Sequence, residues 1–101
     1  MDPQSLLNQA IAFHQTGRLA DAERLYLQLM AAAPREPTAH HMLGVVRAQQ
    51  GRNSEALALM GTALTLRPGA PEVLSNLGNV LRAQGRLEEA LASYDQALAA
   101  K

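Results

Sequence analysis

An internal repeat of 34 residues constrains this 101-residue chain more than any other feature of its sequence. Moving the stretch LSNLGNVLRAQGRLEEALASY back by one period aligns Gly85 with Gly51, and a second step aligns it with Gly17. Three further columns are identical in all three copies, and a fifth is always acidic: Pro3, Pro37 and Pro71; Arg18, Arg52 and Arg86; Ala22, Ala56 and Ala90; Asp21, Glu55 and Glu89. One supersecondary unit is therefore expected three times.

Each copy predicts two antiparallel helices. Apolar residues recur at helical spacing, and Ala and Leu, which suit helices, dominate a composition with only 3% aromatic residues. The first helix is expected from Pro3 to Thr16, and the second starts near Leu19 and stops before Pro34. The last helix is expected over residues 87–100. Short loops between helices favour antiparallel neighbours.

Several residues are candidates for ending these helices. Asp2 is a plausible N-cap before Pro3, and Gly17 is expected to end the first helix in the left-handed conformation. In the second copy two starts remain open, because Asn53 is a capping residue while Arg52 with Glu55 gives a competing start.

Small and large residues alternate where the helices of a pair should cross. Gly44 and Gly78 leave room for a close approach, as does Ala10 in the first copy. The second helices supply small partners in the repeated alanine column, and larger residues that fill the gap towards the next copy, namely Tyr26, Met60 and Tyr94. Since one pair cannot bury both of its apolar faces, the copies are expected to stack.

Composition excludes several classes of function. Nine basic residues balance nine acidic ones, so no nucleic acid or anionic membrane is expected as a partner. The absence of cysteine excludes disulfides, thiolate zinc sites and thiol nucleophiles. Residues 1–8 lack the pattern of a signal peptide, and no apolar run reaches the length of a membrane span. We expect a cytoplasmic protein.

The chain also lacks the residues of a catalytic or metal site. His40 and His41 are adjacent, so on a helix they point about 100° apart and do not converge on one ion. His14 belongs to another copy, and we expect the three histidines to pack or to face solvent. The serines have no His and Asp partners that the repeat frame would place beside them. We therefore expect no enzyme activity, no metal and no cofactor.

Together these positions resemble the tetratricopeptide repeat, and the resemblance extends over the full length of the chain. The third copy carries the large, Leu-Gly, large, Ala and aromatic positions of that family, at Leu74, Leu77, Gly78, Leu81, Ala90 and Tyr94. The resemblance implies an all-α fold in which three stacked tetratricopeptide helix-turn-helix repeats form a right-handed superhelical segment, an alpha-alpha superhelix. It implies one domain over residues 1–101, with repeats at about 3–36, 37–70 and 71–101.

Two copies depart from the family pattern. In the first copy Gln9 and Ala10 replace the Leu-Gly pair, which we interpret as a terminal repeat that tolerates solvent. In the second copy His40 and Arg47 occupy positions that are usually aromatic or apolar.

The resemblance also implies a binding surface, because the first helix of each tetratricopeptide pair lines a concave groove that takes an extended peptide or a partner helix. Helical phase places Met42, Ala48, Gln49 and Ala83 on the groove side of the first helices. The residues predicted to line the groove are Asn8, Ile11, His41, Val45, Ser75, Asn76, Asn79 and Arg82. They mix apolar and amide groups, and an amide can bond both the N–H and the C=O of a peptide.

Two subfamilies of tetratricopeptide proteins can be compared with this groove. The third copy is similar to repeats in the protein-binding arm of O-linked N-acetylglucosamine transferases and their bacterial relatives, which use a ladder of asparagines. Asn8 and Asn76 match that ladder, and Met42 interrupts it. Chaperone-binding arrays instead hold a peptide C-terminus with Lys and Asn, where this chain has Leu7 and Ile11.

Three functional hypotheses follow from the sequence. The first is a non-catalytic scaffold for protein–protein interaction whose groove binds a protein or peptide partner. The second is the substrate-recruiting arm of a larger enzyme such as a glycosyltransferase. The third is self-association into a homo-oligomer through the last helix, which we expect to expose Leu91, Tyr94, Ala97 and Leu98.

Overall fold

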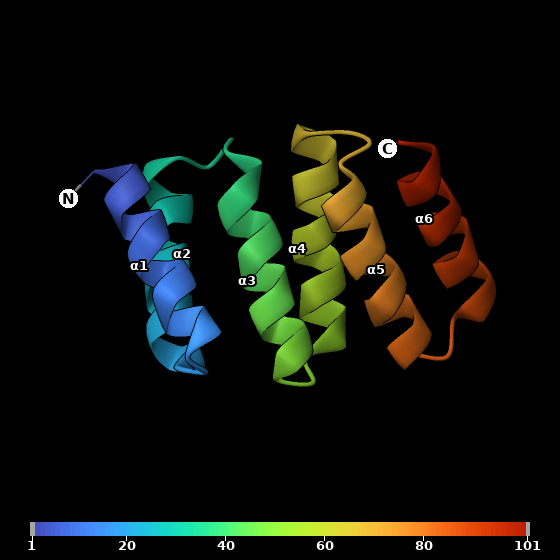
Figure 1. Ribbon diagram of the computed structural model, residues 1–101, viewed down its shortest axis with the longest axis horizontal. Coiled ribbons are helices and arrows are strands. Elements are labelled where there is room, and N and C mark those ends of the chain that lie inside the picture. Colours follow the sequence, from blue (N-terminus) through green and yellow to red (C-terminus); the bar gives the residue numbers. More distant parts are fainter. Residues whose placement is uncertain (1, 101) are drawn as a thin grey trace.

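The computed structural model describes residues 2–100, and every regular element in that range is an α-helix. The expected all-α fold is confirmed. Figure 1 shows the helices stacked in chain order, from α1 at one end of the molecule to α6 at the other. The helices are α1 (Pro3–Gln15), α2 (Leu19–Ala32), α3 (Pro37–Gln49), α4 (Asn53–Leu66), α5 (Pro71–Ala83) and α6 (Leu87–Ala99).

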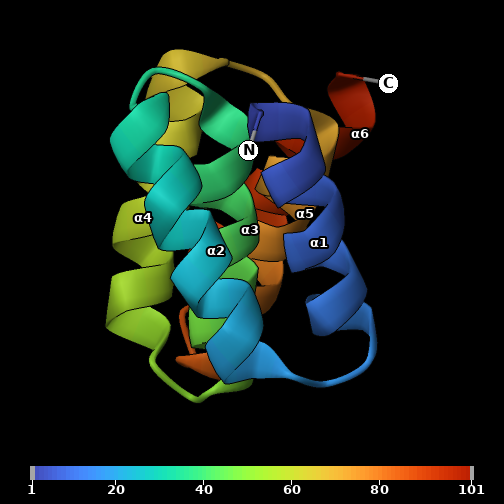
Figure 2. The same cartoon turned by 90° about the vertical axis from the view of Figure 1, so that its left-hand side faces the viewer.

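The helices form three antiparallel pairs, α1 with α2, α3 with α4, and α5 with α6 (Figure 1). Successive pairs pack side by side, and the resulting body measures 41 × 25 × 19 Å. The end view in Figure 2 places α2 and α4 on one side of the stack and α1 and α5 on the other. The first helices therefore share one face, which is where the sequence placed a groove.

Prolines and glycines set the helix ends. Pro3, Pro37 and Pro71 each stand at the start of a first helix, where the missing N–H would have no partner. Gly17 has φ +80°, and the N–H of the following Arg18 donates to the carbonyl of Phe13 at 2.8 Å. This 6→1 bond caps the helix, and it recurs after Gly51 and Gly85.

Three details of the helix ends can be compared with the sequence. Asp2 is the N-cap of α1, since its carboxylate accepts from the Ser5 N–H at 2.9 Å. Helix α1 ends at Gln15, one residue before the expected Thr16. Of the two starts left open for α4, the structure has Arg52 at the cap position, paired with Glu55, while Asn53 is the first helical residue.

Close approach within the pairs depends on glycine. A Cβ built on Gly78 would lie 2.6 Å from Cε1 of Tyr94, and one built on Gly44 would lie 3.0 Å from Cγ of Met60. Any side chain at Gly78 would therefore displace the tyrosine ring. These distances confirm the expected close approach at Gly44 and Gly78, and they show that Met60 and Tyr94 also pack within their own pairs.

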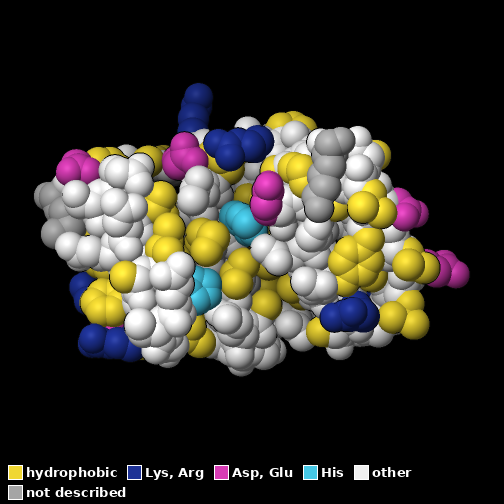
Figure 3. All heavy atoms as spheres, in the orientation of Figure 1, with side chains coloured by type: hydrophobic (Ala, Val, Ile, Leu, Met, Phe, Trp, Pro, Cys, Tyr) yellow, Lys and Arg dark blue, Asp and Glu magenta, His cyan; other side chains and the backbone are white. Residues whose placement is uncertain are grey.

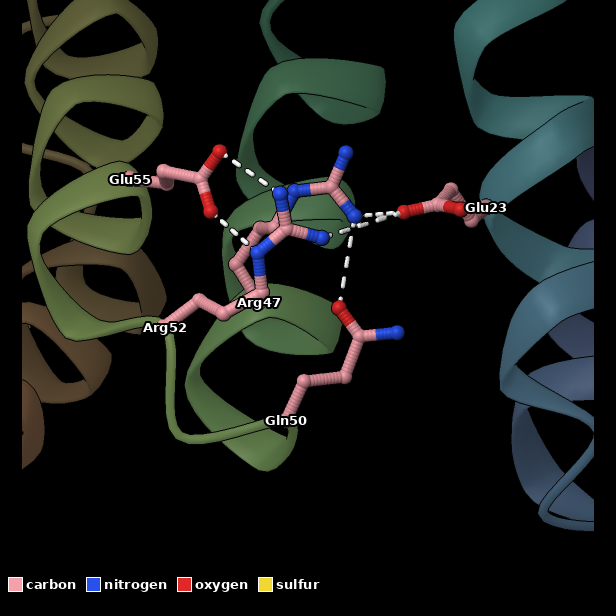
Figure 4. Close-up of polar contacts among 5 residues, drawn as sticks. All are labelled: Glu23, Arg47, Gln50, Arg52 and Glu55. Carbon is pink, nitrogen blue, oxygen red and sulfur yellow. Dashed lines mark hydrogen bonds and ion pairs between the residues drawn. The ribbon is translucent and has the colours of Figure 1, made fainter.

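The junction between the first two pairs contains charged groups in place of apolar ones. The Arg47 guanidinium on α3 forms an ion pair with Glu23 on α2, and it donates to Gln50 Oε1 at 3.3 Å (Figure 4). Only 12% of the Arg47 side chain is exposed. The exposed Arg52 approaches Glu23 at 3.9 Å and pairs with Glu55, so one network joins α2, α3 and α4. Arg47, which departs from the family pattern, thus has an ion-pair partner in Glu23 that the sequence did not indicate.

The repeat supplies a native replacement for this ion pair. The residues 34 positions after Glu23 and Arg47 are Leu57 and Leu81, which are partly buried and buried respectively. We expect Arg47→Ala to lower the free energy of unfolding by about 2 kcal/mol, because it leaves Glu23 without its partner. The double replacement Glu23→Leu with Arg47→Leu should regain most of that loss. Urea denaturation of the wild type, Arg47→Ala and the double variant measures the free energy of unfolding. A double variant no more stable than Arg47→Ala would contradict this prediction.

Candidate functional site

The eight residues predicted to line a groove all lie on the first helices α1, α3 and α5. Figure 3 shows this face of the molecule, where histidine and hydrophobic side chains occupy the middle and most charged groups lie towards the edges. The structure therefore places these residues on one face with little charge at its centre.

A pocket of about 270 Å³ opens between α3 and α5 and brings three of the predicted residues together. Val45 lies on α3, and Asn76 and Asn79 lie on α5. None of the lining residues is charged. The complete lining is Val45, Ala48, Gln49, Asn53, Met60, Asn76, Asn79, Val80 and Ala83.

Asn76 and His41 connect α5 to α3 at one edge of this pocket. The side-chain amide of Asn76 donates to Nε2 of His41 at 2.8 Å, which requires a neutral imidazole. Burial lowers the pKa of His41 below its ordinary value of 6.5, and the nearby Glu72 carboxylate acts in the opposite direction. His41 also faces a second hollow of about 130 Å³ that Arg67 and Glu72 help to line.

The other asparagines also have partners within the chain. Asn79 accepts a hydrogen bond from the Tyr94 hydroxyl at 2.6 Å, and Asn8 accepts one from the side chain of Gln4 at 3.0 Å. Each amide still has groups free to bond a ligand, because one such contact uses only part of its capacity. Met42 is half-buried between these positions and packs against the core, so the asparagine ladder is interrupted as expected.

Five predicted groove residues do not line this pocket, and His41 at its edge is one of them. Ser75 shares another hollow, of about 320 Å³, with Asn76, Glu72 and Pro71. Ile11 is half-buried on α1, and Arg82 is exposed near the end of α5. Asn8, also on α1, does not line that pocket either.

Sequence reasoning missed three residues that line the pocket, namely Asn53, Met60 and Val80. Met60 was assigned only to packing, and Asn53 only to helix capping, yet both line the pocket. The repeat columns held the signal, since Met60 replaces the tyrosine found at 26 and 94, and Asn53 replaces the leucine found at 19 and 87. A change of size within an otherwise uniform column can mark a place where the stack opens.

The proposed self-association face on α6 is only partly as expected. Leu91 and Leu98 are 62% and 68% exposed, and Leu87, which sequence reasoning missed, is 59% exposed. Tyr94 is half-buried because its ring covers Gly78. The expectation for Ala97 was wrong: it is 3% exposed, because it lies on the side of α6 that packs against α5.

The histidines pack within the fold. His40 is buried, and its Nε2 donates to the carbonyl of Pro34 at 2.9 Å. His14 bonds both Tyr26 and Gln49. Within residues 2–100 no three His, Cys, Asp or Glu side chains come close enough to hold a metal ion. In the same range every helix is too short or too polar to span a bilayer.

Stacked helix pairs with a shared concave face define a class of helical-repeat proteins that act as binding scaffolds. Two family models, both described as tetratricopeptide repeat, match residues 5–38 and 41–101. The chain therefore belongs to the tetratricopeptide-repeat family. Its three pairs are tetratricopeptide repeats that form a right-handed alpha-alpha superhelix.

Solved structures agree with this assignment. The chain is 31% identical to an O-GlcNAc transferase of Thermobaculum terrenum, with a TM-score of 0.95 over 98% of this chain but 19% of that one. It is 20% identical to the first tetratricopeptide domain of Spaghetti bound to an HSP90 peptide, with a TM-score of 0.93 over 98% and 79% of the two chains. It is 19% identical to the Yersinia enterocolitica translocator chaperone SycD, with a TM-score of 0.92 over 97% and 73%. No curated protein sequence matches it.

The burial of His41 predicts a pH dependence of stability, because it lowers the pKa of the imidazole. A pKa that is lower in the folded state means that the unfolded chain binds more protons, so stability falls as the pH drops below about 6.5. The variant His41→Gln keeps a hydrogen-bond acceptor for Asn76 but does not titrate. We expect urea unfolding between pH 8 and pH 5 to show a smaller loss of stability for this variant than for the wild type. If the free energy of unfolding falls equally with pH in both proteins, the prediction is contradicted.

Proposed function

We propose that this chain is a non-catalytic scaffold whose concave groove binds an extended peptide or a partner helix. The observation that carries the proposal is the pocket between α3 and α5, where Val45 supplies apolar surface and Asn76 and Asn79 supply amides. Amide side chains suit a peptide backbone because they donate and accept hydrogen bonds at once. The remaining predicted residues lie on the same face along α1, α3 and α5.

The chemistry of the groove favours a neutral segment as partner. A related fold, that of the Spaghetti domain, was solved with an HSP90 peptide. At the positions where chaperone-binding arrays have Lys and Asn, this chain has the half-buried Leu7 and Ile11. We therefore infer a partner held by apolar and amide contacts, with neither nucleic acid nor membrane involved. We also propose a cytoplasmic location.

Replacing the two groove asparagines tests the proposal. We expect Asn76→Ala with Asn79→Ala to weaken the binding of peptides selected from a random library by about tenfold, since both amides face the pocket. The matched control is Gln28→Ala with Gln96→Ala, which removes two exposed amides from second helices. Binding is measured by isothermal calorimetry, with helicity checked by circular dichroism. Equal affinity of wild type and groove variant would refute the proposal.

The recruiting arm of a larger enzyme is a second use of the same groove. It is favoured by the 31% identity to the O-GlcNAc transferase, of which this chain matches 19%. The reading frame that follows the codon for Lys101 discriminates between a scaffold and the recruiting arm of an enzyme. A catalytic domain encoded there supports the arm, and an immediate stop codon excludes it.

Self-association through Leu91, Tyr94 and Leu98 is a third proposal, supported by the exposure of the two leucines. Their counterparts in α4 are Leu57 and Leu64, which pack against the core that α4 shares with α5. The apolar stripe of α6 has no such cover among the described residues. A second copy that docks here would bury it.

The other end of the stack argues for pairing of α6 with α6 of a second copy. Gln9 and Ala12 on α1 are exposed, whereas their counterparts Leu43 and Val46 on α3 are buried in the core. Placing α1 of one copy on α6 of another would therefore bury a polar residue against leucine, which is costly. Symmetric pairing instead places leucine against leucine and closes as a dimer.

Light scattering across a concentration series tests self-association. We expect the mass of the wild-type protein to rise towards that of a dimer, and Leu91→Asp with Leu98→Asp to keep it monomeric. Leu27→Asp is the matched control, because Leu27 is an exposed leucine on α2, 46% accessible, outside the proposed face. A wild-type protein that stays monomeric at millimolar concentration would exclude the dimer.

A further inference from the structure

Three side chains bridge the junction between the first and second repeats. The Tyr26 hydroxyl lies 3.2 Å from Nδ1 of His14, and Nε2 of His14 lies 2.6 Å from Oε1 of Gln49. The two rings meet edge to face, with their centroids 6.0 Å apart. A phenol, an imidazole and an amide from α2, α1 and α3 thus occupy the space between the first two repeats.

The same three positions are different at the next junction. Thirty-four residues after Tyr26, His14 and Gln49 the chain has Met60, Ala48 and Ala83. All three of these residues line the 270 Å³ pocket between α3 and α5. None of them carries a ring or a strong hydrogen-bonding group. The pocket is therefore the space that aromatic and amide side chains fill at the first junction.

We propose that this pocket is an anchor site for a tyrosine side chain of the bound segment, which rests on the proposed function of the groove. Its size is sufficient, since a dry cavity of about 150 Å³ accommodates a benzene molecule. Its lining is neutral, so it favours an uncharged ring. The amides of Gln49, Asn53 and Asn79 at the pocket offer partners for a hydroxyl.

A phenol is favoured over a purely aliphatic side chain by the equivalent junction. There the protein itself places a phenol in this space, and its hydroxyl ends a chain of hydrogen bonds that runs to Gln49. Gln49 also lines the pocket at the second junction. A tyrosine from a partner would thus place in the second junction a phenol like the one that Tyr26 supplies at the first.

The probe for this site is 4-methylphenol, titrated into isotopically labelled protein and followed by amide chemical shifts. We expect saturable shifts at Val45, Ala48 and Ala83. The variant Met60→Tyr with Ala48→His restores two residues of the first junction and fills the pocket, so the probe should bind at least about tenfold more weakly. Met60→Leu is the matched control, because it changes the same position and leaves the pocket open.

Two results would overturn the anchor site. One is the absence of saturable shifts at the lining residues of the wild-type protein. The other is equal binding of 4-methylphenol by wild type and filled variant. The complementary variant His14→Ala with Tyr26→Met places at the first junction the residues found at the second. It should open a similar pocket there, so 4-methylphenol should cause a second set of amide shifts near Ile11.

Peptides from the random library separate this inference from the groove itself. Enrichment of tyrosine, together with weaker binding to Met60→Tyr with Ala48→His, supports the anchor site. Peptides that bind wild type and filled variant equally well refute the anchor site and leave the groove proposal standing. Saturable binding of 4-methylphenol without binding of any peptide refutes the groove and leaves the pocket as a small-molecule site.

Discussion

The whole molecule depends on one packing constraint, which is that a helix pair has two apolar faces and can cover only one of them by itself. The other face is buried only when the next pair stacks on it. The two core clusters reflect this, because Tyr26 of α2 and Val46 of α3 share one of them, while Met60 of α4 and Val80 of α5 share the other. The groove is a consequence of the same constraint, since stacking is what aligns α1, α3 and α5 on one face.

The two junctions solve the same packing problem with different chemistry. The first uses the Arg47–Glu23 ion pair and the hydrogen bonds of His14, all of which depend on two partners being present. The second uses leucines at the positions of the ion pair and leaves open the space that His14 helps to fill at the first. Polar networks specify one arrangement, whereas an open pocket lined by apolar and amide groups can accept an outside group. The first junction is therefore closed by contacts within the chain, whereas the second leaves a pocket in which we propose that a partner binds.

Much of the fold could be predicted because it follows from local rules. The prolines and the positive-φ glycines each act within a few residues of their own position, and they recur at one spacing. The site was harder to predict. Asn76 and Asn79 were placed on the right face by helical phase, but their bonds to His41 and Tyr94 come from residues far apart in the sequence. Ala97 was misplaced because helical phase alone does not tell which side of α6 faces α5.

By itself, the sequence determined the number of helices, the prolines and glycines near their ends, and the family, and it predicted which helices share a face. These properties depend on periodicity and on residues close in the chain, so they can be read without coordinates. Only the tertiary structure decided how equivalent positions differ between repeats. The partner of Arg47, the burial of His40 and the pocket beside Met60 arise where two repeats meet. Such contacts depend on the shapes of side chains brought together by packing, and neither partner alone specifies them.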